Sequence, residues 1–156
     1  MPGRGSRPPA DAHEAALRLL DVRERSRREL AGRLREKGFE PAQIEPELER
    51  LAEVGLLDDR RFACLRARAL VRRGQGPRRI EADLRARGVS REDIAAALEQ
   101  ALEGERPAER MRALVVKRFG EGCLGAEADP KLRARAQRYL LQKGFAPDEV
   151  LPLFER

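Results

Sequence analysis

The sequence of 156 residues lacks tryptophan and contains one tyrosine, one histidine and two cysteines. Two cysteines cannot build a disulfide framework, and with one histidine they cannot supply the four ligands of a tetrahedral zinc site. There is neither an apolar run of about 18 residues to span a membrane nor an apolar segment at the start to act as a secretory signal. We therefore expect free thiols at Cys64 and Cys123, no bound metal, no membrane contact and a cytoplasmic location.

Signatures of catalysis and nucleotide binding are also missing. The phosphate-binding patterns G-x-x-x-x-G-K-[ST] and G-x-G-x-x-G do not occur, and no partner motif accompanies His13. Carboxylates are abundant, but no pair stands out as placed for acid and base catalysis. We expect no enzyme activity, no catalytic residue and no cofactor, and we expect His13 to be a surface residue at the start of the first helix.

What the sequence does contain is one apolar pattern written three times. The first copy is Leu30, Leu34, Gly38, Phe39, Ile44 and Leu48. It recurs 50 residues later as Ile80, Leu84, Gly88, Val89, Ile94 and Leu98. A looser copy, a further 56 residues along, is Ala136, Leu140, Gly144, Phe145, Val150 and Phe154. Such a period is typical of stacked supersecondary units.

Each copy reads as a pair of helices. Apolar residues four apart share a helical face, and the glycine that follows suits a left-handed closing position. Ser26 with Glu29 forms a capping-box pattern, and Pro77 follows Gly76 at a plausible helix start. A further helical segment precedes each pair, at residues 12–22, 59–73 and 107–119, and no alternating strand pattern of useful length appears.

We therefore predict an all-α fold of three tandem three-helix repeats. The repeats cover residues 12–57, 58–104 and 105–156, after a disordered basic leader at residues 1–11. Aromatic residues make up only 4% of the chain and charged residues 38%. Thin helices that complete their burial by stacking on neighbours fit this composition, so we expect an elongated, curved, solenoid-like molecule.

Charge is segregated along the chain, whose formal net charge is +6. Acidic residues gather in the third helices, as Glu45, Glu47, Glu49, Glu53, Glu92, Asp93, Glu99 and Glu103. Basic residues gather in the first and second helices and suggest a positive side for a polyanion. The candidate contacts are Arg25, Arg27, Arg28, Arg35, Arg72, Arg73, Arg78, Arg79, Arg85 and Arg87. The alternative reading is that arginine merely replaces lysine, which occurs at four positions only.

The turn from Arg72 to Ile80 is the most specific basic stretch. A helix ends at Gly74 and another begins at Pro77, so exposed amides and a positive dipole end would be surrounded by arginines. A glycine-ended helix joined to a proline-started one also needs no ligand. Because Phe39, Phe145 and Phe154 fall on core positions of the repeat, we expect backbone charge rather than base stacking to dominate any nucleic-acid binding.

These residues resemble the RecX family of bacterial regulators. The likeness is carried by residues 57–63 (Leu-Asp-Asp-Arg-Arg-Phe-Ala), by residues 73–80 (Arg-Gly-Gln-Gly-Pro-Arg-Arg-Ile), and by the flanking copies at residues 23–30 and 138–145. It covers nearly the whole chain from Ala12. The chain departs from the family pattern at Pro107, where members often carry a tryptophan.

The resemblance implies a regulator without catalytic residues. Such proteins bind the recombinase RecA along the groove of its filament on DNA, and they restrain filament growth, ATP hydrolysis, strand exchange and the co-protease activity that triggers the SOS response. The resemblance thus places the chain in DNA recombination and repair. We expect a monomer with weak, salt-dependent binding to single- and double-stranded DNA.

Two other classes of binding protein fit the same charge pattern. A plain DNA-binding helical module would bind nucleic acid tightly without RecA. An adaptor for protein partners, acting through either charged side, would bind little DNA even at low salt.

Overall fold

The computed structural model of the chain describes residues 11–155, which form nine α-helices, one short 3₁₀ turn and no strand. Unit 1 contains α1 (Ala12–Val22), α2 (Arg27–Glu36) and α3 (Pro41–Glu53). Unit 2 contains α4 (Asp59–Arg72), α5 (Pro77–Ala86) and α6 (Arg91–Ala101). Unit 3 contains α7 (Pro107–Phe119), η1 (Glu121–Cys123), α8 (Pro130–Lys143) and α9 (Pro147–Leu153). The predicted all-α fold of three-helix units is confirmed.

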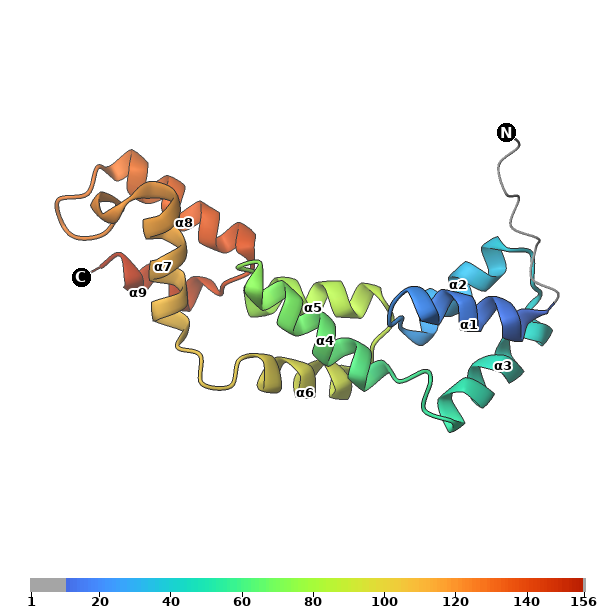
Figure 1. Cartoon of the computed structure of the whole chain (residues 1–156). Coiled ribbons are helices and arrows are strands. Elements are labelled where there is room, and N and C mark those ends of the chain that lie inside the picture. Colours follow the sequence, from blue (N-terminus) through green and yellow to red (C-terminus); the bar gives the residue numbers. More distant parts are fainter. Residues whose placement is uncertain (1–10, 156) are drawn as a thin grey trace, which may run out of the picture.

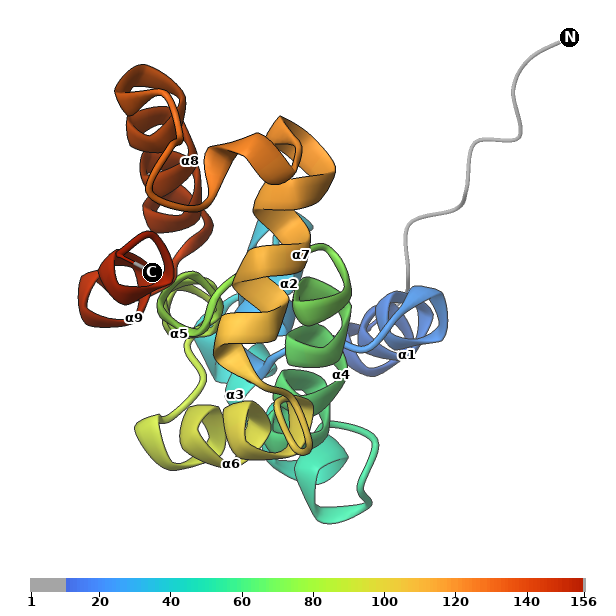
Figure 2. The ribbon, with the colours of Figure 1, turned by 90° about the vertical axis from the view of Figure 1, so that its left-hand side faces the viewer.

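The units follow one another along one long axis, with unit 1 and unit 3 at opposite ends (Figure 1). Figure 2 looks along this axis from the end of unit 3 and shows α8 and α9 beside α7, with the other units behind them. Of the leader predicted at residues 1–11, residues 1–10 lie outside the described part of the chain. Asp11 is the N-cap of α1, and its carboxylate accepts a hydrogen bond from the Glu14 amide at 2.8 Å.

Local sequence signals explain where the helices begin and end. Ser26 and Glu29 form the expected capping box at α2. Glycines at φ of +94°, +81° and +98° follow α2, α5 and α8, where a residue with a side chain would be strained; they are Gly38, Gly88 and Gly144. The larger offset before the third copy is taken up by η1 and the loop that leads to α8.

Each unit packs its own core, which differs from the expectation that neighbouring units complete one another's burial. Unit 1 buries Leu30 and Leu34 among residues of its own three helices, and unit 2 does the same with Ile80 and Leu84. Unit 3 forms a third separate cluster around Leu140. Three short helices meet closely enough to bury their apolar stripes, so the contacts between units are free to be polar.

The middle helices α8, α5 and α2 run head to tail, each ending where the next begins (Figure 1). At the α5–α2 joint, the Ser26 hydroxyl donates a hydrogen bond of 2.7 Å to the carbonyl oxygen of Arg87. Gly88 lies so close to the Arg28 stem that an added Cβ would stand 2.7 Å from the Arg28 Cβ. The C-terminal end of one middle helix is thus in direct contact with the N-terminal end of the next.

The α8–α5 joint repeats this arrangement at equivalent positions. The amide of Gly76 donates to the carbonyl oxygen of Lys143 at 2.6 Å, and that of Arg78 donates to Gly144 at 3.0 Å. A Cβ added to Gly76 would stand 2.5 Å from the carbonyl carbon of Gly144. Main-chain atoms of two units therefore touch here, and only glycine leaves the necessary room.

Candidate nucleic-acid interface

Several of the predicted contact residues form ion pairs with carboxylates of the chain itself. Arg27 on α2 reaches across to α3, where its guanidinium lies 2.6 Å from Glu49 and 3.2 Å from Glu45. The hydrogen bond to Glu49 raises the pKa of Arg27, although burial acts against it. Basic residues of a second helix and acidic residues of a third helix thus face each other within one unit.

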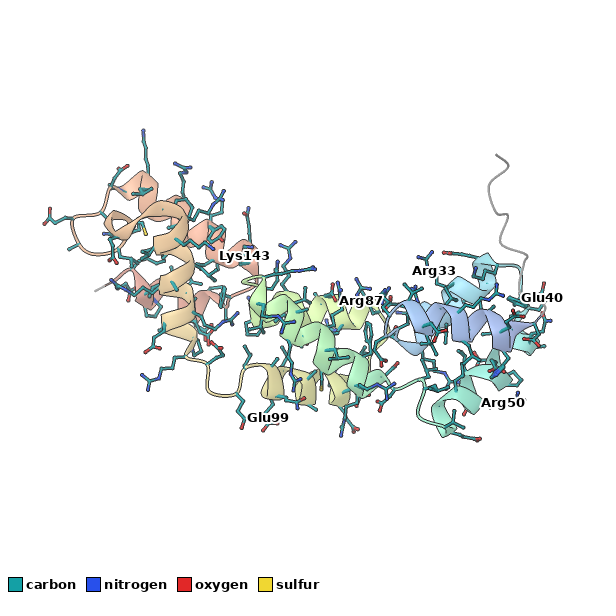
Figure 3. The ribbon with its side chains drawn as sticks, viewed as in Figure 1. Arg33, Glu40, Arg50, Arg87, Glu99 and Lys143 are labelled. Carbon is teal, nitrogen blue, oxygen red and sulfur yellow. The ribbon has the colours of Figure 1, made fainter. Side chains whose placement is uncertain are left out.

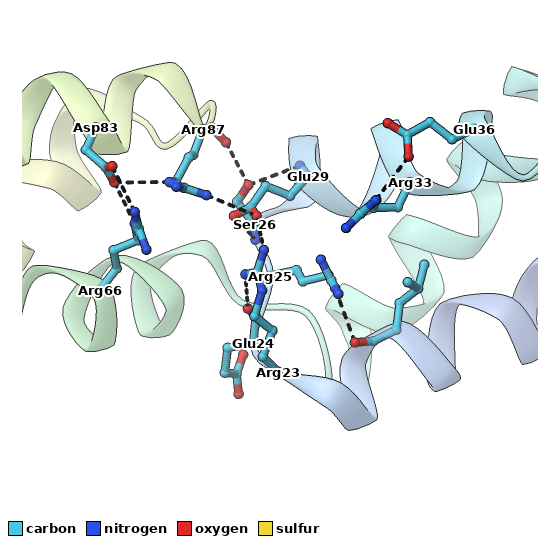
Figure 4. A network of polar contacts seen from close by, with 11 residues as sticks. Arg23, Glu24, Arg25, Ser26, Glu29, Arg33, Glu36, Arg66, Asp83 and Arg87 are labelled. Carbon is cyan, nitrogen blue, oxygen red and sulfur yellow. Dashed lines mark hydrogen bonds and ion pairs between the residues drawn. The ribbon is translucent and has the colours of Figure 1, made fainter. Parts of the chain in front are cut away.

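A denser ion-pair network holds unit 1 against unit 2 (Figure 4). Asp83 accepts from Arg66 at 2.6 Å and from Arg87 at 3.0 Å. Arg87 also lies 3.2 Å from Glu29 of unit 1, which in turn pairs with Arg23 at 2.6 Å. The charge of Arg87 is therefore neutralised in the joint and is not offered to a polyanion.

Of the remaining predicted contact residues in or next to α2 and α5, two are bonded to other groups of the chain and two have no ion-pair partner. Arg25 is 5% exposed and donates to the carbonyl oxygen of Leu19 at 3.2 Å, and Arg85 pairs with Glu81 on its own helix. Burial lowers the pKa of Arg25. By contrast, Arg28 and Arg35 are exposed and form no ion pair with any described carboxylate.

At the α4–α5 turn, the expectation of exposed amides is wrong, whereas three of the four arginines remain candidate contacts. The amides at the start of α5 are not exposed, because those of Gly76 and Arg78 are bonded to the end of α8. Arg79 uses its guanidinium to reach the carbonyl oxygen of Gln142 at 2.8 Å. Arg72, Arg73 and Arg78 are exposed and have no ion-pair partner in residues 11–155.

Arg72 and Arg73 line a groove of about 650 Å³ between the end of α4 and helices α7 and α8. We call it the basic groove. Its cations are Arg72, Arg73, Arg110, Lys117 and Arg118. Val71, Ala113, Leu114 and Tyr139 supply apolar and aromatic surface, and none of the described residues in the lining is acidic. Arg110 lies 3.8 Å from Glu105, but the other four cations have no ion-pair partner among residues 11–155. Unpaired positive charge in a concave site is suited to a polyanion.

Arg110 fixes the floor of the basic groove. Its guanidinium donates to the carbonyl oxygens of Gln75 at 3.0 Å and Val71 at 3.4 Å, and it lies 5.4 Å from the ring centroid of Phe145. Burial lowers the pKa of Arg110, but an arginine keeps its charge at neutral pH. Arg110 therefore ties α7 to the end of α4 in unit 2.

Sequence reasoning missed the half of this site that unit 3 provides. A smaller hollow of about 150 Å³ adjoins the basic groove, shares Arg118 and Tyr139 with it, and is also lined by Arg135 and Arg138. The available signal was the pair of neighbouring basic residues near the ends of two opening helices, which α1 lacks. Helices α4 and α7 open their units and both end in a basic pair, Arg72 with Arg73 and Lys117 with Arg118.

The two long sides of the molecule differ in charge without being uniform. In Figure 3, Arg33, Arg87 and Lys143 lie along the side of α2, α5 and α8, whereas Glu99 lies on the α6 side. Arg50 interrupts the acidic side at α3. Arg33 and Arg87 on the first side are ion-paired, whereas Arg72, Arg73, Lys117 and Arg118, which have no ion-pair partner in the described residues, meet at the joint between units 2 and 3.

The described residues form neither a metal site nor a membrane-spanning helix. Within residues 11–155 no three His, Cys, Asp or Glu side chains are grouped to hold a metal ion. No helix in this range has both the length and the apolar character needed to cross a bilayer. Cys64 and Cys123 are free thiols, as predicted. His13 lies in α1, as expected, and is also hydrogen-bonded to Glu47 of α3.

Family models match almost the whole described chain. The models for the first, second and third three-helix domains of RecX match residues 12–51, 58–98 and 105–151. "Regulatory protein RecX" of Halorhodospira halophila is 46% identical over 137 residues, which cover 88% of this chain and 82% of that protein. The protein of the same name from Chromohalobacter salexigens is 39% identical and covers 90% and 89% of the two chains.

Solved structures of similar proteins have the same fold. A crystal structure of regulatory protein RecX superposes with a TM-score of 0.73 and 25% identity, over 88% of this chain and 67% of that one. The crystal structure of RecX from Lactobacillus salivarius gives a TM-score of 0.72 at 23% identity, over 91% of each chain.

Proposed function

This chain belongs to the RecX family of regulatory proteins, and on that basis we propose that it binds the recombinase RecA and RecA filaments on DNA. In this proposal it acts by binding, and it restrains filament growth, ATP hydrolysis, strand exchange and the co-protease activity that triggers the SOS response. It would thereby regulate DNA recombination and repair.

The observation that carries the DNA part of this proposal is the basic groove. Arg72, Arg73, Lys117 and Arg118 bring cations from two units to one concave site with no acidic residue in the described lining. Each phosphate contact of a cation releases condensed counterions, so such a site favours a nucleic-acid backbone at low and moderate salt. The elongated shape supports contact with neighbouring protomers of a helical polymer.

The test measures the DNA-dependent ATPase and strand exchange of RecA with this protein added well below the RecA concentration. We expect wild-type protein to slow both activities, because a regulator that stops growth of a cooperative polymer affects many protomers per copy. The variant Arg72→Glu/Lys117→Glu should lose most of this inhibition. Each phosphate contact that it loses should flatten the salt dependence of single-stranded DNA binding by about 0.7 in log–log slope.

A matched control is Arg91→Glu/Lys131→Glu, which carries the same charge change. Both residues are exposed in the first turns of α6 and α8, where an acidic side chain is favourable. This variant should inhibit like wild type, and circular dichroism should show both variants folded. If wild-type protein at a stoichiometric ratio to RecA changes neither activity, the regulatory proposal is wrong.

The same groove favours a second candidate, a DNA-binding module that acts without RecA. The discriminating measurement is the affinity for DNA with and without the recombinase. Tight binding that RecA does not change, together with unaltered RecA activities, would support this second candidate. A pull-down of RecA that strengthens on adding single-stranded DNA would support the regulatory proposal instead.

A further inference from the structure

Tyr139 is the only tyrosine of the chain, and its ring belongs to both hollows at the joint between units 2 and 3. It is partly exposed on α8 and packs edge to face against Phe119, with ring centroids 5.6 Å apart and an interplanar angle of 79°. This contact fixes the plane of the ring. Among the described residues, the Tyr139 hydroxyl has no hydrogen-bond partner, and it is not one of the buried polar atoms that lack one.

Cations surround this aromatic pair. The Arg118 Cζ lies 5.2 Å from the centroid of Tyr139, and the Lys143 Nζ lies 5.6 Å from it. Arg135 lies 5.7 Å from the centroid of Phe119. None of these three cations pairs with a carboxylate in the part of the chain that the structure describes. Cation–π contacts hold them at the ring, but like charges gathered at one site still lack an anion.

The mixture of groups fits a nucleotide better than a bare phosphate. A phosphate alone needs only cations, whereas this site combines long cationic side chains with an aromatic ring and the apolar side chain of Leu114. Bases of a single strand are free to stack on an aromatic ring or on an arginine plane. In a duplex the bases are already stacked inside, so duplex DNA would meet only the charges.

We propose that Tyr139 is a stacking platform for one base of single-stranded DNA, with Arg118 and Lys143 leaving the ring for the flanking phosphates. This inference rests on the proposed DNA contact at the basic groove and adds a base contact to it. It also differs from our expectation that backbone charge rather than base stacking would dominate, which rested on the phenylalanines at core positions of the repeat.

The test uses the full-length protein and its own fluorescence. Because the chain has one tyrosine and no tryptophan, tyrosine emission reports on this ring alone. A short oligothymidylate should quench the emission and bind more tightly than an abasic oligonucleotide of the same length. The abasic strand carries the same phosphates, so it should bind by charge with little quenching.

Variants separate stacking from charge. Tyr139→Leu should weaken oligothymidylate binding about 5- to 100-fold, leave abasic binding unchanged, and keep the salt slope, because no phosphate contact is lost. Tyr139→Phe should retain oligothymidylate affinity within about twofold, since phenylalanine keeps a stacking face.

Three outcomes would overturn the stacking proposal: equal wild-type affinity for the two oligonucleotides, unchanged oligothymidylate affinity in Tyr139→Leu, or a large loss in Tyr139→Phe. If Tyr139→Leu does not fold, the two-oligonucleotide comparison and Tyr139→Phe decide. If the wild type binds neither oligonucleotide, the DNA contact in the proposed function fails together with the stacking site. Binding of both with equal affinity removes only the stacking site.

Discussion

Asp83 holds two arginines of unit 2, Arg66 and Arg87, and Arg87 in turn pairs with Glu29 of unit 1. The Asp83 carboxylate accepts from both Nε and an Nη of Arg66, at 2.6 and 2.9 Å, and also from Arg87. The hydrogen bond from Arg66 lowers the pKa of Asp83, while partial burial acts in the opposite direction. The ionised carboxylate is therefore favoured in the folded protein over the unfolded chain.

We predict that Asp83→Asn lowers the free energy of unfolding at pH 7 by about 1–3 kcal/mol, because two arginines lose a charged acceptor. A carboxyl group with a lowered folded-state pKa contributes stability above its unfolded pKa of about 3.9 and loses it as pH falls below that value. Urea unfolding of both proteins at pH 7 and at pH 3 measures this. A wild-type advantage of the same size at both pH values would contradict it.

The sequence predicts which residues are buried better than it predicts which charged residues form ion pairs. Leu34 and Leu84 are fully buried as their four-residue spacing indicates. Arg27 and Arg72 both stand in Arg-Arg pairs, yet Arg27 is ion-paired and Arg72 is exposed without a partner. Pairing depends on which carboxylate packs across the unit, and no spacing along the chain encodes that distance.

At the scale of helices, the head-to-tail joints set how the units are placed. Successive middle helices align their dipoles, and the carbonyl groups that end one helix accept hydrogen bonds from the cap of the next. In the α8–α5 joint both partners are main-chain groups, so the geometry depends on the absence of a side chain at Gly76.

We predict that Gly76→Ala lowers the free energy of unfolding by about 1–3 kcal/mol, because the new methyl group would overlap the backbone of Gly144. The conformation at Gly76, with φ −85° and ψ 166°, suits alanine, so the cost would come from contact alone. Thermal and urea unfolding measure the change.

Gly32→Ala is the matched control within α2, where a Cβ would meet nothing within 4 Å. This substitution should raise stability by up to about 1 kcal/mol, because alanine favours the helix. Equal stability of Gly76→Ala and wild type would show that the joint is looser than described.

Helix starts and ends were predictable because they depend on neighbouring residues: the capping box at Ser26, proline at position 77 and the closing glycines are local signals. The contacts that those helix ends make with other units were not predictable. Gly76 and Pro77 indicate a helix start with free amides, but the end of α8 occupies them. That contact joins two distant parts of the chain, so no local pattern reports it.

At the scale of the whole molecule, separate cores and end-to-end joints produce an extended shape (Figure 1). A compact chain of 156 residues would have a radius of gyration of about 15 Å. We predict a clearly larger value in small-angle X-ray scattering, with a distance distribution that has a long tail. A value close to that of a compact chain would contradict the extended arrangement.

The α5–α2 joint and the α8–α5 joint are built in the same way. In each, a glycine-ended helix meets the first turn of the next middle helix, and the cap residue bonds to the last carbonyl groups. Since every unit holds its own core, a coupling of this kind does not limit how many units can be joined. Adding or removing a unit would change the reach of the molecule and leave the remaining couplings as they are. The length of the molecule is therefore set by the number of units, and it can change without any change in the core of a unit.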